Sequence, residues 1–270
     1  MPDATVNGVK LAYDVHGDAG EPVVLVCGTG QPAFSYHLFQ VPALTAAGYQ
    51  VVTYDNRGVP PSEATPAPYT VQLLAEDAAA LIEHLGLGPC RVAGTSLGAL
   101  ITQELALSRP DLVRAAVMMG TFGRQDAYMR YLTRSWVELD ESGIELPRLY
   151  DVVSGMPALF TPATLRNDEG VQLMVEFQVA APAWGGPGRL GQHLADREYD
   201  NRLDALGGIR VPSMVIAFEH DMLTAVPQCQ EVAKAIPDCR YVEIANAGHA
   251  GPFERYEEVN AVLLEFFAEV

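Results

Sequence analysis

Positive charge is scarce in this chain of 270 residues. Lysine and arginine together number 17, aspartate and glutamate number 34, and the formal net charge is −17 at pH 7. Repulsion between like charges opposes the approach of such a chain to a phosphate backbone or to an anionic membrane surface. We therefore expect neither nucleic acid nor membrane as a partner. A small-molecule substrate, bound by a monomer or a homodimer, fits this composition better.

Long apolar runs are also lacking. No stretch of 18 apolar residues occurs, so no membrane-spanning helix is predicted. The first residues, Met1 to Val6, have neither the basic nor the apolar region of a secretory signal peptide. We therefore expect a cytoplasmic protein.

Cysteine and histidine do not occur in metal-binding patterns. The sequence has no C-x-x-C pair and no H-E-x-x-H pair. We interpret Cys27, Cys90, Cys229 and Cys239 as reduced thiols, and Cys27 as a small buried apolar residue rather than a redox or catalytic group. No metal site and no cofactor are expected.

Hydrophobic residues make up 49% of the chain and charged residues 19%, enough for one large domain with a sizeable core. Short β-branched runs alternate with amphipathic stretches, which predicts an α/β fold: a mostly parallel central sheet of about eight strands with helices on both faces. Strands are expected over 9–15, 23–26, 51–54, 90–93, 115–119, 213–218 and 241–244, the first in an antiparallel hairpin that turns at Asn7-Gly8. Helices are expected over 71–85 (with Thr70 as N-cap), 97–108, 227–236 and 256–267.

Residues 122–204 interrupt this alternation because they contain no strand-like run. We interpret them as an α-helical cap inserted into a core formed by 1–121 and 205–270. Aromatic residues in this segment could line an apolar substrate pocket or simply pack its helices: Tyr128, Tyr131, Trp136, Tyr150, Phe160, Phe177 and Trp184. Trp136 and Trp184 are candidates for substrate binding. His193 and the arginines at positions 124, 130, 134, 148 and 166 are interpreted as a solvated face.

The segment Gly94-Thr95-Ser96-Leu97-Gly98 lies where a buried strand is expected to end and a helix to begin. A serine on such a tight turn has strained dihedral angles, and glycines two residues away on either side let the two chain segments approach. The pattern therefore predicts an exposed nucleophile at Ser96.

A serine hydroxyl needs a base, and the base needs a third group to orient it. His249 lies between small residues in a loop before the last helix, and Asp221 follows the expected strand 213–218. Functional side chains gather at that edge of an open α/β sheet. The order Ser96, Asp221, His249 is one of the known orders of a catalytic triad. Asp126 is an alternative acid.

These motifs resemble those of the α/β-hydrolase fold family over nearly the whole chain. The resemblance implies that the backbone N–H groups of Leu97 and Thr29 form an oxyanion hole and that Gly28 and Gly30 line the substrate site. It also implies a structural role for Asp55 and Arg57 in the loops beneath the site. Two departures stand out. Cys27 replaces a common histidine, and Gly30 lies where the cofactor-free haloperoxidases generally have proline.

The resemblance, with serine at position 96, excludes the epoxide hydrolases and haloalkane dehalogenases, which use aspartate there. We expect a serine hydrolase that cleaves a small, largely apolar carboxylic ester or lactone through an acyl-enzyme. Hydrolysis of a carbon–carbon bond, or a non-hydrolytic cyclase or binding protein acting on a secondary metabolite, are the alternatives.

Overall fold

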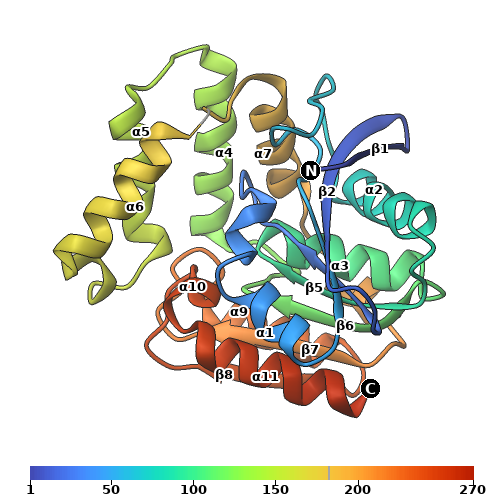
Figure 1. Cartoon of the computed structure of the whole chain (residues 1–270). Coiled ribbons are helices and arrows are strands. Elements are labelled where there is room, and N and C mark those ends of the chain that lie inside the picture. The colour runs from blue at the N-terminus through green and yellow to red at the C-terminus, as the bar shows by residue number, and fades with distance from the viewer. Residues whose placement is uncertain (182) are drawn as a thin grey trace.

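The computed structural model describes residues 1–181 and 183–270, and a single eight-stranded sheet forms its centre (Figure 1). The order across the sheet is β1-β2-β4-β3-β5-β6-β7-β8. The strands are β1 (Asp3–Val6), β2 (Val9–His16), β3 (Pro22–Val26), β4 (Gln50–Tyr54), β5 (Cys90–Thr95), β6 (Val113–Met119), β7 (Ser213–Phe218) and β8 (Arg240–Ile244). β2 pairs antiparallel with both β1 and β4, and all other pairings are parallel. The predicted fold class is confirmed.

The edge hairpin turns where the sequence predicts. Asn7 and Gly8 both have positive φ angles, 44° and 71°, as the tight turns of two-residue hairpins require. Val6 lies opposite Val9 in the register. The turn thus places β2 between β1 and the parallel part of the sheet.

Helices cover both faces of the sheet, and each face has its own hydrophobic core. The helices are η1 (Ala33–Tyr36, 3₁₀), α1 (Gln40–Ala46), α2 (Val71–His84), α3 (Leu97–Ser108), α9 (Val226–Ala235), α10 (Gly251–Glu254) and α11 (Tyr256–Glu269), besides those between β6 and β7. Side chains from α2, α3 and α9 pack in one core, and those from α1 and α11 pack in the other. Along β3, Val24 and Val26 face the first core while Val23 and Leu25 face the second, because successive strand residues point to opposite faces.

Helix boundaries follow the sequence pattern closely. Thr70 caps α2, because its hydroxyl accepts a hydrogen bond from the Leu73 N–H at 3.1 Å, as predicted. The short helix α1 was not predicted, since its seven residues are too few to show a helical period. Within the described residues, no helix is both long enough and apolar enough to cross a membrane.

Between β6 and β7 the described residues form helices and no strand: α4 (Ala127–Ser142), α5 (Arg148–Leu159), η2 (Thr164–Arg166, 3₁₀), α6 (Asp168–Ala180), α7 (Gly186–Glu198) and α8 (Leu203–Leu206). Figure 1 shows α4 to α7 grouped together at one side of the sheet. We call residues 127–198 the α4–α7 segment. Helix α4 packs against α7, and α5 packs against α6.

Helix α7 lies directly on loops of the core. A Cβ atom added to Gly58 would stand 2.7 Å from the Cα of Gly188, so only two glycines allow this approach. One turn further on, a Cβ at Gly191 would come within 2.4 Å of the Tyr69 ring. The α4–α7 segment is therefore held against the core at α7. By contrast, α6 has no buried residue.

Candidate active site

Ser96 occupies a strained turn between β5 and α3. Its dihedral angles are φ 56° and ψ −123°, a conformation that residues with side chains rarely adopt. The surrounding glycines explain how the turn is accommodated. A Cβ at Gly94 would lie 2.0 Å from the Gly98 carbonyl oxygen, and a Cβ at Gly98 would lie 2.1 Å from that of Val26. The turn therefore has the local geometry that the G-x-S-x-G spacing predicts.

Asp221 and His249 form a buried pair. Asp221 Oδ2 accepts a hydrogen bond from His249 Nδ1 at 2.8 Å, and Asp221 Oδ1 accepts the N–H groups of Leu223 and Thr224, each at 2.8 Å. Burial alone would raise the pKa of Asp221. The charge and hydrogen bond of His249 and the donors of Thr224 outweigh burial and lower this pKa below its ordinary value. Asp221 is therefore ionised at neutral pH and holds the Nδ1 side of the imidazole, which leaves Nε2 for proton transfer.

The three residues come from the carboxyl ends of parallel strands, at one edge of the sheet. Ser96 follows β5, Asp221 comes after β7 and His249 comes after β8. Gly120, which follows β6, lies against the Asp221–His249 pair. A Cβ there would stand 3.3 Å from Asp221 Oδ2 and 3.5 Å from His249 Cε1. Because Gly120 has no side chain, it leaves space for the imidazole of His249 at the end of β6, the strand beside β5 and Ser96.

The serine and the imidazole are not hydrogen-bonded to each other in this structure. Among the described residues, the Ser96 hydroxyl makes no hydrogen bond, and its backbone N–H donates to the Met119 carbonyl oxygen at 3.0 Å. Catalytic hydrogen bonds are often long before a substrate binds. The arrangement therefore supplies an ordered acid–imidazole pair and a strained serine at the same edge.

The turn after β3 lies against Ser96. A Cβ at Gly28 would be 3.2 Å from Ser96 Cβ. The N–H groups on either side of Thr29 are occupied: that of Gly28 donates to Gln31 Oε1 and that of Gly30 donates to Gln192 Oε1, both at 2.8 Å. Within the described chain, no acceptor is found for the N–H of Thr29 or for that of Leu97.

Cys27 is fully buried, as expected. Burial and the nearby charge of Asp55 raise the pKa of its thiol well above the ordinary value, which makes a thiolate nucleophile unfavourable. Asp55 and Arg57 also have the structural contacts expected of them. Asp55 Oδ1 accepts the Ala33 N–H at 2.7 Å, and Arg57 forms a two-point ion pair with Asp77.

Two residues of α7 that the sequence did not indicate also reach the site. Gln192 Oε1 accepts the Gly30 N–H, and Asp196 Oδ2 accepts the Thr29 hydroxyl at 2.7 Å. They are four residues apart and therefore share one face of the helix. The sequence shows that the two residues share a helix face. It does not show that this face packs on the turn after β3.

Asp196 adds a second buried carboxyl group near the imidazole. Burial raises its pKa to about 6, and the Thr29 hydrogen bond and the charges of His193 and His249 oppose this rise. For His249, burial alone would lower the pKa. The charge and hydrogen bond of Asp221, with the charge of Asp196, outweigh burial and raise the pKa above its ordinary value. Asp196 and His249 are therefore electrostatically coupled.

The two tryptophans lie at different distances from the turn after β3. A Cβ at Gly30 would meet the Trp184 ring at 2.5 Å, and Trp184 Nε1 donates to the Gly58 carbonyl oxygen at 3.0 Å. Trp136 instead packs against the ring of His193, with 5.3 Å between ring centroids. The structure thus brings Trp184 into contact with Gly30, whereas Trp136 lies on the other neighbour of Trp184, the His193 ring.

Two other interpretations from the sequence need correction. His193 is buried and its Nδ1 lies 2.6 Å from Asp140 Oδ2, so it is not on a solvated face; the reason is that α4 supplies an acidic partner to α7. Asp126 caps α4 by accepting the Met129 N–H and is not an alternative acid of the site. Four of the seven aromatic residues are largely exposed: Tyr128, Tyr131, Tyr150 and Phe177. Of these, Tyr131 lines a surface hollow beside α4, and the Phe177 ring stands edge to face against Phe34 with 5.5 Å between ring centroids.

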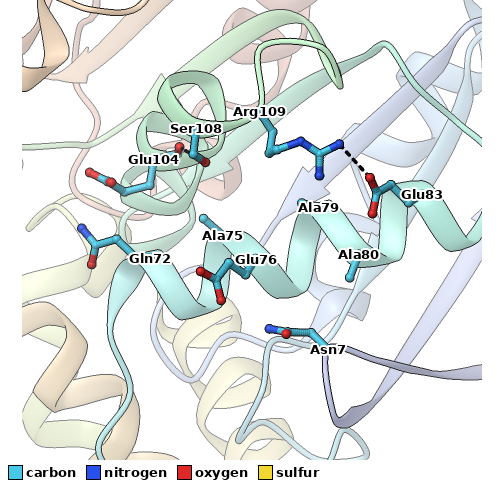
Figure 2. A pocket seen from close by; sticks show the side chains of 10 residues that line it. All are labelled: Asn7, Gln72, Ala75, Glu76, Ala79, Ala80, Glu83, Glu104, Ser108 and Arg109. Carbon is cyan, nitrogen blue, oxygen red and sulfur yellow. Dashed lines mark hydrogen bonds and ion pairs between the residues drawn. The ribbon is translucent and has the colours of Figure 1, made fainter.

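A surface hollow of about 400 Å³ lies elsewhere, between α2 and α3 (Figure 2). Arg109 and Glu83 form an ion pair of 2.7 Å at one end of it. Its lining includes Glu76 and Glu104 and none of Ser96, Asp221 and His249. This hollow is therefore separate from the candidate site.

Residues 23–262 match the model of the alpha/beta hydrolase family, and the chain belongs to that family. The putative non-heme bromoperoxidase BpoC of Mycobacterium tuberculosis is 41% identical over 262 residues, which cover 97% of this chain and 99% of that protein. Its crystal structure superposes with a TM-score of 0.89, at 40% identity and 96% coverage of each chain. The putative carbamate hydrolase RutD of Azorhizobium caulinodans is 31% identical over 273 residues, 100% of this chain and 99% of that one. The enol-lactonase of Burkholderia xenovorans has a TM-score of 0.83 at 27% identity, covering 99% of this chain and 100% of that one. These similarities support an enzyme of hydrolase type.

Proposed function

We propose that this protein is a serine hydrolase that cleaves a small, largely apolar carboxylic ester or lactone. The observation that carries the proposal is the strained Ser96 at the sheet edge that also holds the hydrogen-bonded His249–Asp221 pair. Ser96 Oγ attacks the acyl carbonyl carbon while His249 Nε2 takes its proton. The imidazolium then protonates the leaving oxygen, and Asp221 stabilises it and keeps the proton on Nδ1. Water, deprotonated by His249, releases the acid and restores Ser96.

The developing oxyanion requires donors near Ser96. The N–H groups of Thr29 and Leu97 are the proposed pair, because the neighbouring N–H groups of Gly28 and Gly30 already donate to glutamine side chains. Those two contacts also fix the turn, so that its remaining donor is oriented before a substrate binds. Each such donor is worth about 10²–10³ in rate. Gly28, whose backbone lies against Ser96, and Gly30 would line the acyl group.

The α4–α7 segment is the proposed cap, within an insertion spanning 122–204. It supplies Trp184 against Gly30 as an apolar wall, with the His193 ring between Trp184 and Trp136. The likeness to the Burkholderia xenovorans enol-lactonase favours a lactone or ester among acyl substrates. Carbamate cleavage is a second candidate, because relatives about 30% identical are named putative carbamate hydrolases. It uses the same attack on a carbonyl carbon.

A fluorophosphonate probe tests the nucleophile directly. We expect one adduct per chain on the Ser96 peptide, lost in Ser96→Ala and strongly slowed in His249→Ala. Ser135→Ala is the matched control, because Ser135 is exposed on α4. Equal labelling of Ser96→Ala, or an undiminished rate in His249→Ala, would overturn the proposal.

A substrate panel separates the reactions. We expect p-nitrophenyl esters of short apolar acids and small lactones to be hydrolysed, with a burst of one p-nitrophenol per active site if the acyl-enzyme accumulates. Carbamates and vinylogous diketones are tested beside them. If only a carbamate or only a diketone were turned over, the proposed triad would stand, but the proposed ester or lactone substrate would be wrong.

A further inference from the structure

Asp14, His16 and His37 converge at the edge of the sheet, away from the triad. One ligand atom from each, a carboxylate oxygen or an imidazole nitrogen, lies within 4.8 Å of the others. Asp14 and His16 are two residues apart on β2 and so point to the same side of the sheet. His37 directly follows η1. The sequence predicts no metal site because these histidines are 21 positions apart, and only the fold joins them.

The side chains of this cluster are not engaged elsewhere in a way that would prevent ligation. The imidazole rings of His16 and His37 stand edge to face with 4.5 Å between centroids. Thr53 Oγ1 lies 3.0 Å from His37 Nε2 and 3.5 Å from His16 Nε2. Across the described residues, the carboxylate of Asp14 has no hydrogen bond or ion pair. All three residues are partly buried, so the cluster is shielded but reachable by an ion.

We propose that Asp14, His16 and His37 bind a divalent transition-metal ion of the zinc class, with water as the fourth ligand. Two imidazoles and one carboxylate suit zinc, whereas magnesium and calcium prefer oxygen ligands alone. Tetrahedral zinc with bonds of about 2.0–2.1 Å holds its ligand atoms about 3.3 Å apart. The side chains must therefore draw together by about 1.5 Å at most, which rotation about their χ angles supplies.

The surroundings also favour a cation. Thr53 provides a hydroxyl partner for an imidazole, the outer contact that usually orients a metal-bound histidine. The net charge of −17 raises the local concentration of cations around the chain.

A bound ion would join strand β2 to the segment after η1. The neighbouring Tyr36 hydroxyl donates to the Val26 carbonyl oxygen and can accept from the hydroxyl of Thr95, one residue before Ser96. The ion would therefore brace the segment that follows the turn after β3, as a structural site rather than a catalytic one. Binding to the folded form alone stabilises it by mass action.

The test uses the full chain without an affinity tag, stripped with a chelator and titrated with zinc. We expect one zinc ion per chain by native mass spectrometry and calorimetry, and a rise of several degrees in the unfolding midpoint that magnesium does not produce. Cobalt as a probe should give the intense visible bands of a tetrahedral site. His37→Gln, His16→Gln and Asp14→Asn should each weaken zinc binding at least tenfold.

His84→Gln is the matched control, because His84 is an exposed histidine in the last turn of α2. Circular dichroism of each metal-free variant checks that it folds. If a histidine variant does not fold, Asp14→Asn is used in its place to test zinc binding. Unchanged zinc affinity in His37→Gln and Asp14→Asn would overturn the proposal, as would binding weaker than millimolar or equal loss in His84→Gln.

Discussion

The carboxyl group of Asp196 accepts the hydroxyl of Thr29 at 2.7 Å, which joins helix α7 to the turn beside Ser96. This places an ionisable group of the α4–α7 segment on the same turn that carries the free Thr29 N–H. The charge of Asp196 also raises the pKa of His249, and burial raises the pKa of Asp196 itself. Two predictions concern this carboxyl group.

Asp196→Asn should extend hydrolytic activity to lower pH. In the proposed mechanism His249 must be neutral to accept the Ser96 proton, so activity should rise as pH passes through the pKa of His249. The charge of Asp196 raises that pKa, and its removal should move the acid limb of kcat/KM against pH toward lower pH. Glu198→Gln, an exposed carboxylate change on the same helix, should leave the limb in place. An acid limb at the same pH in Asp196→Asn would show that the two groups are not coupled.

The same variant should alter stability in a pH-dependent way. The pKa of Asp196 is about 6 in the folded chain, against about 3.9 when unfolded. Because the folded pKa is the higher one, ionisation of Asp196 costs stability, and this cost grows as pH rises through 6. Asp196→Asn removes it, so the variant should gain up to about 3 kcal/mol relative to the parent between pH 4 and pH 8. Urea unfolding at both pH values measures the difference, and a constant offset would contradict the expectation.

Asp221→Asn should lower kcat by about 10³–10⁴ while the chain stays folded. The carboxylate accepts three donors besides His249, from Leu223 and Thr224, and an amide cannot accept all of them and still orient Nδ1–H. Steady-state kinetics on the best ester of the panel measure the loss. Asp126→Asn, at the N-cap of α4, should keep kcat within a few-fold. A comparable loss in both variants would indicate a general effect on folding.

Gly98→Ala should destabilise the chain by at least about 3 kcal/mol, because the new Cβ would overlap the Val26 carbonyl oxygen at 2.1 Å. Gly155→Ala is its control. Gly155 lies inside α5 with open space around its Cβ position, so alanine should stabilise the chain by about 0.5–1 kcal/mol. Thermal and urea unfolding of both variants should give opposite signs, and a neutral Gly98→Ala would refute the steric account of the turn.

Asp77→Ala should cost about 3–5 kcal/mol, because it leaves the buried Arg57 without its two-point partner. The side chains of this pair are only 7% and 2% exposed. Glu83→Ala removes one of the two exposed partners of Arg109, which keeps Asp111, and should cost no more than about 1 kcal/mol. Urea unfolding separates the two, and similar losses would mean that burial does not decide the effect.

Local patterns predicted much of the fold and of the candidate site. The serine turn could be predicted because its two glycines and the flanking strand and helix are contiguous in the sequence, within residues 90–108. Asp221 and His249 could be placed because each follows a strand-like run, and the carboxyl ends of parallel strands share one edge of the sheet.

Contacts set by the tertiary packing of helices could not be predicted. In the sequence, Gln192 and Asp196 differ little from residues of an exposed helix face, since what buries them is the turn after β3, some 160 positions away. His193 was misinterpreted for the same reason, because its acidic partner comes from another helix.

The backbone approach of Gly58 and Gly188 bears on attempts to transplant the α4–α7 segment. A methyl group at position 188 would come within 2.3 Å of the Gly58 carbonyl oxygen. A chimaera that takes this segment from a relative must therefore keep glycine on both sides of the junction. Otherwise α7 would be lifted away, and Trp184, Gln192 and Asp196 would lose their register with the loops they contact.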